Sequence, residues 1–139
     1  MSAKHNGTVW LSSDGSPTKL YVTETVCGGK KKKCTCGKND MQQRIVDLFH
    51  KLRTTLGFPL TVNSGFRCPE YNATLEGAKK QSQHLLGKAL DIALPTGMSA
   101  DTMEYHMETA GATAIGKYKT FCHMDEREGQ FRWDYRNVK

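Results

Sequence analysis

The stretch SQHLLGKALDIAL, residues 82–94, decides how the rest of the chain is interpreted. It places His84 and Asp91 on either side of Gly87. On a continuous helix, a spacing of seven residues would separate the two side chains by roughly 10 Å along the axis, too far to share one metal ion. The chain must therefore turn between them, and Gly87 permits such a turn. The alternation in KALDIAL then predicts a strand.

This predicted strand has one unusual face. Its large aliphatic residues point to one side, towards a core, while Asp91 lies on the other side between two alanines. The small neighbours leave room above the carboxylate. A carboxylate on a mostly covered strand must be paired or bound to a metal.

A second local pattern is FCHMD, residues 121–125. If this segment is a strand, Phe121, His123 and Asp125 share one face, and residues two apart lie roughly 7 Å from one another. Such a pair allows one residue to hold a metal while the other reaches the metal-bound water. Two imidazoles and one carboxylate form a catalytic zinc set with a fourth position open for water. The alternative for each histidine is an ordinary surface or core position.

The order of the remaining patterns predicts an α+β fold in a single domain over residues 1–139. Residues 1–38 are expected to form an irregular or β-rich extension, in which TVWLSSDGSPTKLYV predicts a hairpin. Residues 39–139 are expected to form the core.

Two helices are predicted within this core. The first is expected to be capped by Asn39 or Asp40 and to end at Gly57. The second is expected from Ser99 to Thr109, closed by a glycine. FPLTVNSGFR and TAIGKYKTFCHMD predict strands, and the last residues, EREGQFRWDYRNVK, are interpreted as a polar tail.

The formal charge of the 139-residue chain is +6, which favours anionic partners such as a bacterial cell wall. Much of the excess lies in Lys30–Lys33, a run more typical of a solvated loop than of a binding patch. We expect no nucleic-acid partner, because no recognition motif accompanies these lysines. We also expect no membrane insertion, and synthesis in a cytoplasm without a signal peptide.

The cysteines allow several interpretations. Cys27, Cys34 and Cys36 could form a second, structural zinc site with Cys68, although the usual Cys-x-x-Cys spacing is absent. Free thiols or a disulfide are the alternatives. Cys122 is expected to face the core, and its pairing with a histidine as a nucleophile is a weaker interpretation than a zinc site.

Three segments in order, SGFRCPEYN, SQHLLGKALDI and FCHMD, resemble the zinc D-alanyl-D-alanine carboxypeptidase and murein endopeptidase family. The family pattern Ser-x-His-x-x-Gly-x-Ala-x-Asp is filled at every position by Ser82, His84, Gly87, Ala89 and Asp91. FCHMD is similar to the ending of a compact subfamily common in bacteriophages. The resemblance implies a small antiparallel sheet that carries the metal site and is flanked by helices, as in hedgehog-like folds.

The resemblance also implies roles for individual residues. One catalytic Zn²⁺ would be held by His84, Asp91 and His123. Arg67 would contact the substrate and stabilise developing negative charge, because a guanidinium stays charged and can form two bonds to an oxyanion. Ser82 would contribute to substrate binding.

The chain departs from the family at the usual position of the general base. Many relatives have Glu or Asp three residues before the last ligand, where this chain has Thr120, and others have a histidine at the position of Phe121. Our hypothesis is that Asp125 acts as the base. The alternative is a structural carboxylate that orients a ligand or pairs with Arg127.

The resemblance therefore implies a zinc metallopeptidase that hydrolyses peptidoglycan stem peptides, of the DD-endopeptidase or carboxypeptidase type. We expect a monomeric phage lytic enzyme that reaches the wall after release or as part of a virion. The rival hypothesis is a catalytically inactive zinc-bearing module that binds the cell wall or builds a phage structure.

Overall fold

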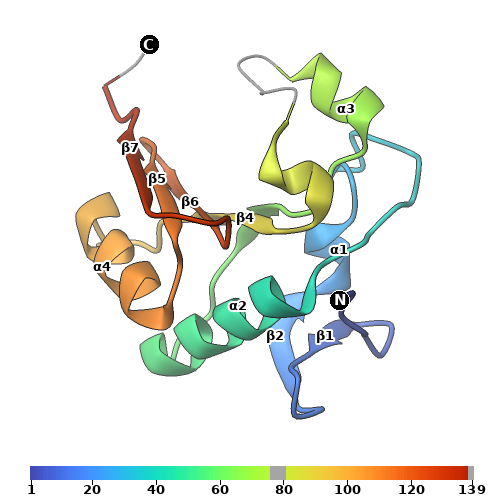
Figure 1. Cartoon of the computed structure of the whole chain (residues 1–139), viewed down its shortest axis with the longest axis horizontal. Helices are drawn as coiled ribbons and strands as arrows, with labels where there is room; N and C mark the ends of the chain where they lie inside the picture. The colour runs from blue at the N-terminus through green and yellow to red at the C-terminus, as the bar shows by residue number, and fades with distance from the viewer. Residues whose placement is uncertain (76–80, 138–139) are drawn as a thin grey trace.

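The computed structural model describes residues 1–75 and 81–137. At its centre lies a five-stranded sheet in the order β3-β4-β6-β5-β7 (Figure 1). The bounds of its strands are β3 Val62–Ser64, β4 Ala89–Ala93, β5 Ala114–Lys117, β6 Phe121–Asp125 and β7 Phe131–Asp134. The predicted α+β fold is confirmed. The sheet is antiparallel except at one edge, where β7 pairs in parallel with β5.

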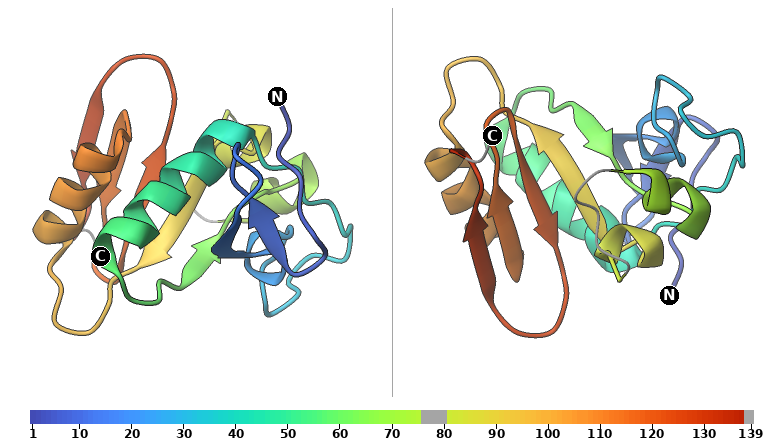
Figure 2. Two further views of the ribbon diagram at one scale, coloured as in Figure 1. Left: turned by 90° about the horizontal axis from the view of Figure 1, so that it is seen from below. Right: turned by 90° about the horizontal axis from the view of Figure 1, so that it is seen from above.

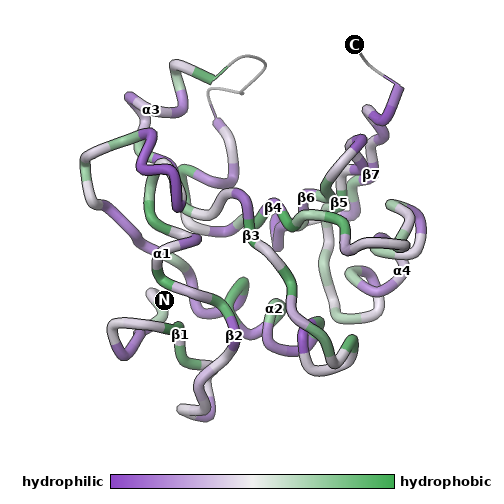
Figure 3. Tube along the Cα trace, turned by 180° about the vertical axis from the view of Figure 1, so that it is seen from behind, coloured by the Kyte–Doolittle hydropathy of each residue, from purple (hydrophilic) through white to green (hydrophobic). Residues whose placement is uncertain are grey.

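The edge strand β7 corrects two expectations, the wholly antiparallel sheet and the polar tail. After β6, the chain passes the end of β5 and pairs along its other side, so β7 must run parallel to β5. Gly116 makes this pairing possible, because a Cβ atom there would lie 2.2 Å from the Trp133 indole. The pattern was missed because one side of this edge strand faces water. The tube in Figure 3 is mostly purple from β7 towards the C-terminus.

Helices α2 (Gln43–Leu56) and α4 (Ala100–Ala110) cover one face of the sheet (Figure 2). The second was predicted correctly: Ser99 caps its start, and Gly111 ends it in a left-handed conformation. The first ends at Gly57 as predicted, but it begins later than expected, with Gln42 as N-cap residue.

The predicted caps of α2 have other partners. The Asn39 side chain donates to the Val22 carbonyl, and the Asp40 carboxylate accepts from the Ser2 hydroxyl. Asn and Asp are strong capping residues, but here their side chains bond to distant residues and do not cap the helix. Because of these tertiary contacts, the helix begins at Gln43, later than the local pattern predicted.

The N-terminal part forms the predicted hairpin from β1 (Val9–Leu11) and β2 (Pro17–Tyr21), followed by the short helix α1 (Val22–Thr25). Trp10 and Leu20 are buried and belong to the same hydrophobic cluster as α2 and the central strands. Among the described residues, no helix combines the length and the apolar character that crossing a membrane requires.

Candidate metal centre

Three segments meet above the sheet face that α2 and α4 leave uncovered. Asp91 on β4 and His123 on β6 are direct partners in the antiparallel ladder. His84 lies in the 3-10 helix η1 (Gln83–Leu86), which sits beside α3 (Pro69–Thr74) in Figure 1.

The predicted turn between His84 and Asp91 is present at Gly87. This glycine has a φ of 68°, in the left-handed region, and a Cβ atom there would lie 2.0 Å from the Asp40 carbonyl oxygen. Only glycine fits both conditions. The turn returns the chain into β4, so that His84 lies above the strand that carries Asp91.

The three side chains converge on one point. His84 Nε2 and His123 Nδ1 lie 3.2 and 3.0 Å from the same oxygen, Asp91 Oδ1. The three residues are buried, with 2%, 7% and 8% of the surface of His84, Asp91 and His123 exposed. The structure therefore brings together all three predicted ligands, and their role as ligands stays a prediction.

Backbone and side-chain acceptors fix which nitrogen of each ring carries a proton. The Gly65 carbonyl oxygen lies 2.7 Å from His84 Nδ1, and the Asp125 carboxylate lies 2.6 Å from His123 Nε2. Both partners can only accept, so these nitrogens must donate. The opposite nitrogens, which face Asp91, are left as the atoms available to a metal ion.

The electrostatics of this arrangement favour a bound cation. Burial lowers the pKa of His84 and favours its neutral form, whose Nε2 lone pair faces a carboxylate oxygen. Burial would also lower the pKa of His123, but hydrogen bonds to Asp125 and Asp91 outweigh it and raise the pKa to about 9. A bound cation would have to displace the His123 proton that faces Asp91. Two nitrogens and one carboxylate oxygen are a donor set that fits a metal ion.

Arg67 holds the other oxygen of the Asp91 carboxylate. Its Nη2 lies 3.3 Å from Asp91 Oδ2, while Nε and Nη1 donate to Ser64 and Asn72. The guanidinium is thereby fixed beside the ligands, and it carries more N–H donors than these three contacts use. The role that the resemblance implies for Arg67, stabilising developing negative charge, stays a prediction.

Asp125 lies behind His123 rather than beside the ligands. It has no exposed surface, and besides the bond to His123 it accepts from the backbone and side chain of Arg127. Burial opposes ionisation, but the bonds from His123 and Arg127 lower the pKa of Asp125 to about 2. This geometry matches the alternative in which the carboxylate orients a ligand, and it gives Asp125 no surface on which to meet a substrate.

Ser82 has a local structural contact. Its hydroxyl accepts from the His84 backbone N–H at 3.2 Å and caps the 3-10 helix. It is only partly buried, so a second contact of the hydroxyl to a substrate stays a prediction.

Aromatic rings form a wall beside the ligands. The Trp133 ring lies 5.2 Å from the His123 ring, and its indole N–H donates to the Tyr118 hydroxyl. Tyr118 stacks on Phe121 with ring centroids 4.4 Å apart. These rings come from β6, β7 and the turn after β5. In the sequence, this wall was indicated by Phe121, which lies two residues before His123 and so on the same strand face.

A comparison with curated proteins found no match. The sequence model of one family, described as Peptidase M15, matches residues 18–125. The matched segment contains the three converging side chains and Arg67, and it spans most of the described fold. The chain belongs to the Peptidase M15 family.

Proposed function

We propose that the protein is a zinc metallopeptidase that hydrolyses peptide bonds in bacterial peptidoglycan. The observation that carries this proposal is the convergence of three atoms that could bind a metal, a carboxylate oxygen of Asp91 and one ring nitrogen from each of two histidines. The opposite nitrogens of the two rings are held by Gly65 and Asp125. Membership of the Peptidase M15 family supports peptide hydrolysis. The resemblance of the sequence to murein peptidases supports the choice of substrate and a bond next to a D-amino acid.

His84, Asp91 and His123 would hold the ion in this proposal. The chemistry that zinc supplies when bound is polarisation of the scissile carbonyl and a lower pKa of water. Gly65 and Asp125 orient the two rings so that His84 Nε2 and His123 Nδ1 face the ion. The rings therefore need no reorientation, and no free energy is spent on it during the reaction.

Arg67 would bind the substrate through its remaining N–H donors. A positioned guanidinium in a partly buried site stabilises negative charge on oxygen more strongly than it would in water. The aromatic wall would exclude water from one side and pack against the stem peptide. Asp125 is a positioning residue in this mechanism, because it contacts His123 and not the substrate.

One observation favours the rival hypothesis of a non-catalytic binding module. The usual base position holds Thr120, and the candidate base Asp125 is buried behind a ligand. A module with the same fold and metal site but without hydrolysis would fit this feature.

Digestion of purified murein sacculi separates the two hypotheses. We expect the zinc-loaded protein to release fragments with new amino termini at stem-peptide cross-links, or to remove a terminal D-alanine, as read by mass spectrometry. His84→Ala should release none, whereas His106→Ala, a partly exposed histidine of α4, should act like the unmodified protein. A folded, zinc-bound protein that cuts no murein of several chemotypes would contradict hydrolysis and favour the binding module.

We further propose a role in lysis by a bacteriophage. The resemblance of FCHMD to a compact phage subfamily supports it, and the net charge of +6 suits an anionic wall polymer. Lysis of cells from within, on co-expression with a membrane-permeabilising protein, tests this role. Absence of lysis by an enzyme active on sacculi would refute it.

A further inference from the structure

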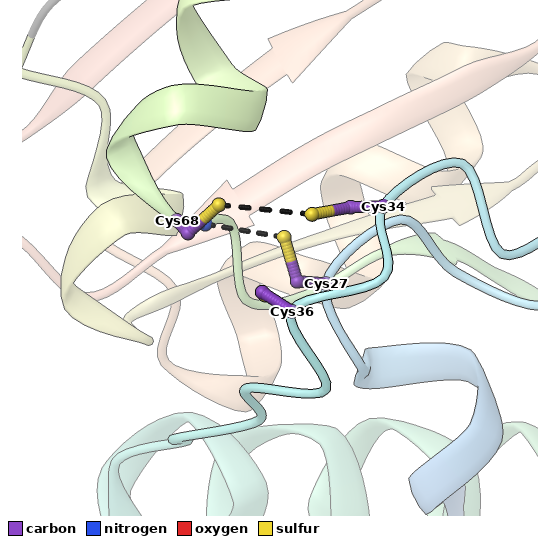
Figure 4. A group of neighbouring side chains, drawn as sticks. All are labelled: Cys27, Cys34, Cys36 and Cys68. Atoms are coloured by element: carbon purple, nitrogen blue, oxygen red, sulfur yellow. Dashed lines mark hydrogen bonds between the residues drawn. The ribbon is translucent and has the colours of Figure 1, made fainter.

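Four cysteines gather at a place that the proposed hydrolysis does not use. Cys27, Cys34 and Cys36 lie in the segment between α1 and α2, and Cys68 immediately precedes α3. Their sulfur atoms all lie within 4.8 Å of one another. Figure 4 shows the four side chains close together. All four are free thiols, with Cys27 and Cys68 buried and Cys36 exposed.

The spacing of the sulfur atoms fits a tetrahedral thiolate site. With zinc–sulfur bonds of about 2.3 Å, the sulfurs of a tetrahedron lie about 3.8 Å apart. Cys34 Sγ and Cys68 Sγ are 3.8 Å apart. No two of the four cysteines have the usual Cys-x-x-Cys spacing, and the fourth sulfur comes from a distant segment, so the set forms only in the folded chain.

Backbone N–H groups already point at three of the sulfurs. The Cys68 N–H donates to Cys27 Sγ at 3.2 Å, the Tyr71 N–H to Cys68 Sγ at 3.4 Å, and the Lys38 N–H to Cys36 Sγ at 3.4 Å. Hydrogen bonds of this kind stabilise a thiolate and orient it towards a metal.

The loop between the first two cysteines is folded tightly. Gly28 has a φ of 86°, and a Cβ atom there would lie 2.3 Å from the backbone nitrogen of Cys34. Residues 28–38 contain no helix or strand, so an irregular loop is held in a compact conformation. Four thiolates and one Zn²⁺ carry a net charge of about −2, which Lys30–Lys33 between these cysteines would offset.

We propose that Cys27, Cys34, Cys36 and Cys68 bind a second zinc ion with a structural role. This ion would join the segment after α1 to the residue next to Arg67. At the same junction, the Phe66 N–H donates a hydrogen bond to the Thr25 carbonyl. The second ion therefore fixes the segment that supplies Arg67 to the candidate active site.

Metal content and spectroscopy test this proposal without any assay of hydrolysis. We expect two zinc ions per unmodified chain and one per chain of His84→Ala. In His84→Ala, X-ray absorption should show a shell of sulfur atoms alone at about 2.3 Å. Cobalt in place of this zinc should give an intense thiolate-to-cobalt absorption band.

Cysteine variants complete the test. Cys34→Ser with Cys36→Ser should lose the cobalt band and one zinc per chain, while Cys122→Ala, at a buried cysteine outside the cluster, should keep both. If the double variant does not fold, the spectra of His84→Ala still decide. The proposal is overturned if His84→Ala holds no zinc, if its zinc has only nitrogen and oxygen neighbours, or if the purified protein has these cysteines in disulfides. Such a failure would leave the hydrolytic proposal intact, because cleavage of murein is measured separately.

Discussion

Replacing Asp125 by asparagine separates the two roles considered for this carboxylate. Asparagine has nearly the same shape, so the buried site should not lose packing. It removes the negative charge that faces His123 Nε2 at 2.6 Å. In the positioning role, the charge fixes the ring so that Nδ1 faces the metal, and its loss should weaken metal binding.

The substitution also changes the bonds to Arg127, for which a control is given below, so the size of the effect on metal binding is worked from the contact with His123. A hydrogen bond to a charged group contributes about 1.5–3 kcal/mol, and a neutral bond about 0.5–1.5 kcal/mol. The neutral amide should therefore weaken the hold on His123 by ~1–1.5 kcal/mol. At about 1.4 kcal/mol per factor of ten, this predicts roughly tenfold weaker metal binding. That value lies at the lower end of the range of about 10–100 for groups that orient metal ligands.

Competition with a chromophoric chelator measures the affinity for zinc at the His84 site. The zinc proposed at the four cysteines is quantified separately. The chain offers a matched control, since Asp134 makes the same set of bonds to Arg136 as Asp125 makes to Arg127 but is exposed and contacts no histidine. Asp134→Asn should leave metal affinity unchanged. If Asp125→Asn binds metal as tightly as the unmodified protein but loses all turnover, the positioning role is refuted and the general-base hypothesis regains support.

Three further predictions concern other parts of the structure. Arg67→Lys should retain the metal but lower kcat/KM at least tenfold, because an ammonium cannot reproduce three separate guanidinium contacts; unchanged cleavage of murein peptides would contradict its role. Gly116→Ala should lower the free energy of unfolding by about 1–3 kcal/mol, because the methyl group would occupy the place of the Trp133 indole; denaturant unfolding measures it, and an unchanged free energy of unfolding would contradict the close contact. Burial raises the pKa of Glu24, so the unmodified protein loses stability as pH rises from the ordinary value of 4.5 through the raised pKa. Glu24→Gln should not share this loss, and its advantage in urea unfolding should appear above about pH 5 and vanish below about pH 4; a difference independent of pH would refute the assignment.

The parts of the site that the sequence predicted are those set by short patterns. The turn at Gly87, the alternation of β4 and the shared face of β6 each depend on neighbours in the chain, and all three were correct. The turn at Gly87 predicted that His84 and Asp91 come together, but His123 was added as the third ligand only by resemblance, because local patterns do not specify which strands pair.

The parts that could not be predicted depend on contacts between distant segments. Strand β7 packs Trp133 against Gly116 of β5, and no local pattern predicts this contact between distant segments. Asp125 shares a face with His123 as expected, but its burial under Arg127 decides what it can do. The four cysteines were considered from the sequence as one possible site, but without the usual spacing only the folded chain shows that Cys68 reaches the other three.

The ladder between β4 and β6 serves the core and the active site with a single alignment. Leu90 and Ile92 pair with Met124 and Cys122 on the buried face, and between them Asp91 pairs with His123 on the other. A slip of one residue would send both polar side chains into the apolar core and the apolar ones out. Mutations that preserve the hydrophobic packing of this face therefore also preserve the alignment of two predicted metal ligands. In evolution, selection for a stable fold keeps two of the three predicted ligand positions aligned even when no selection acts on hydrolysis itself.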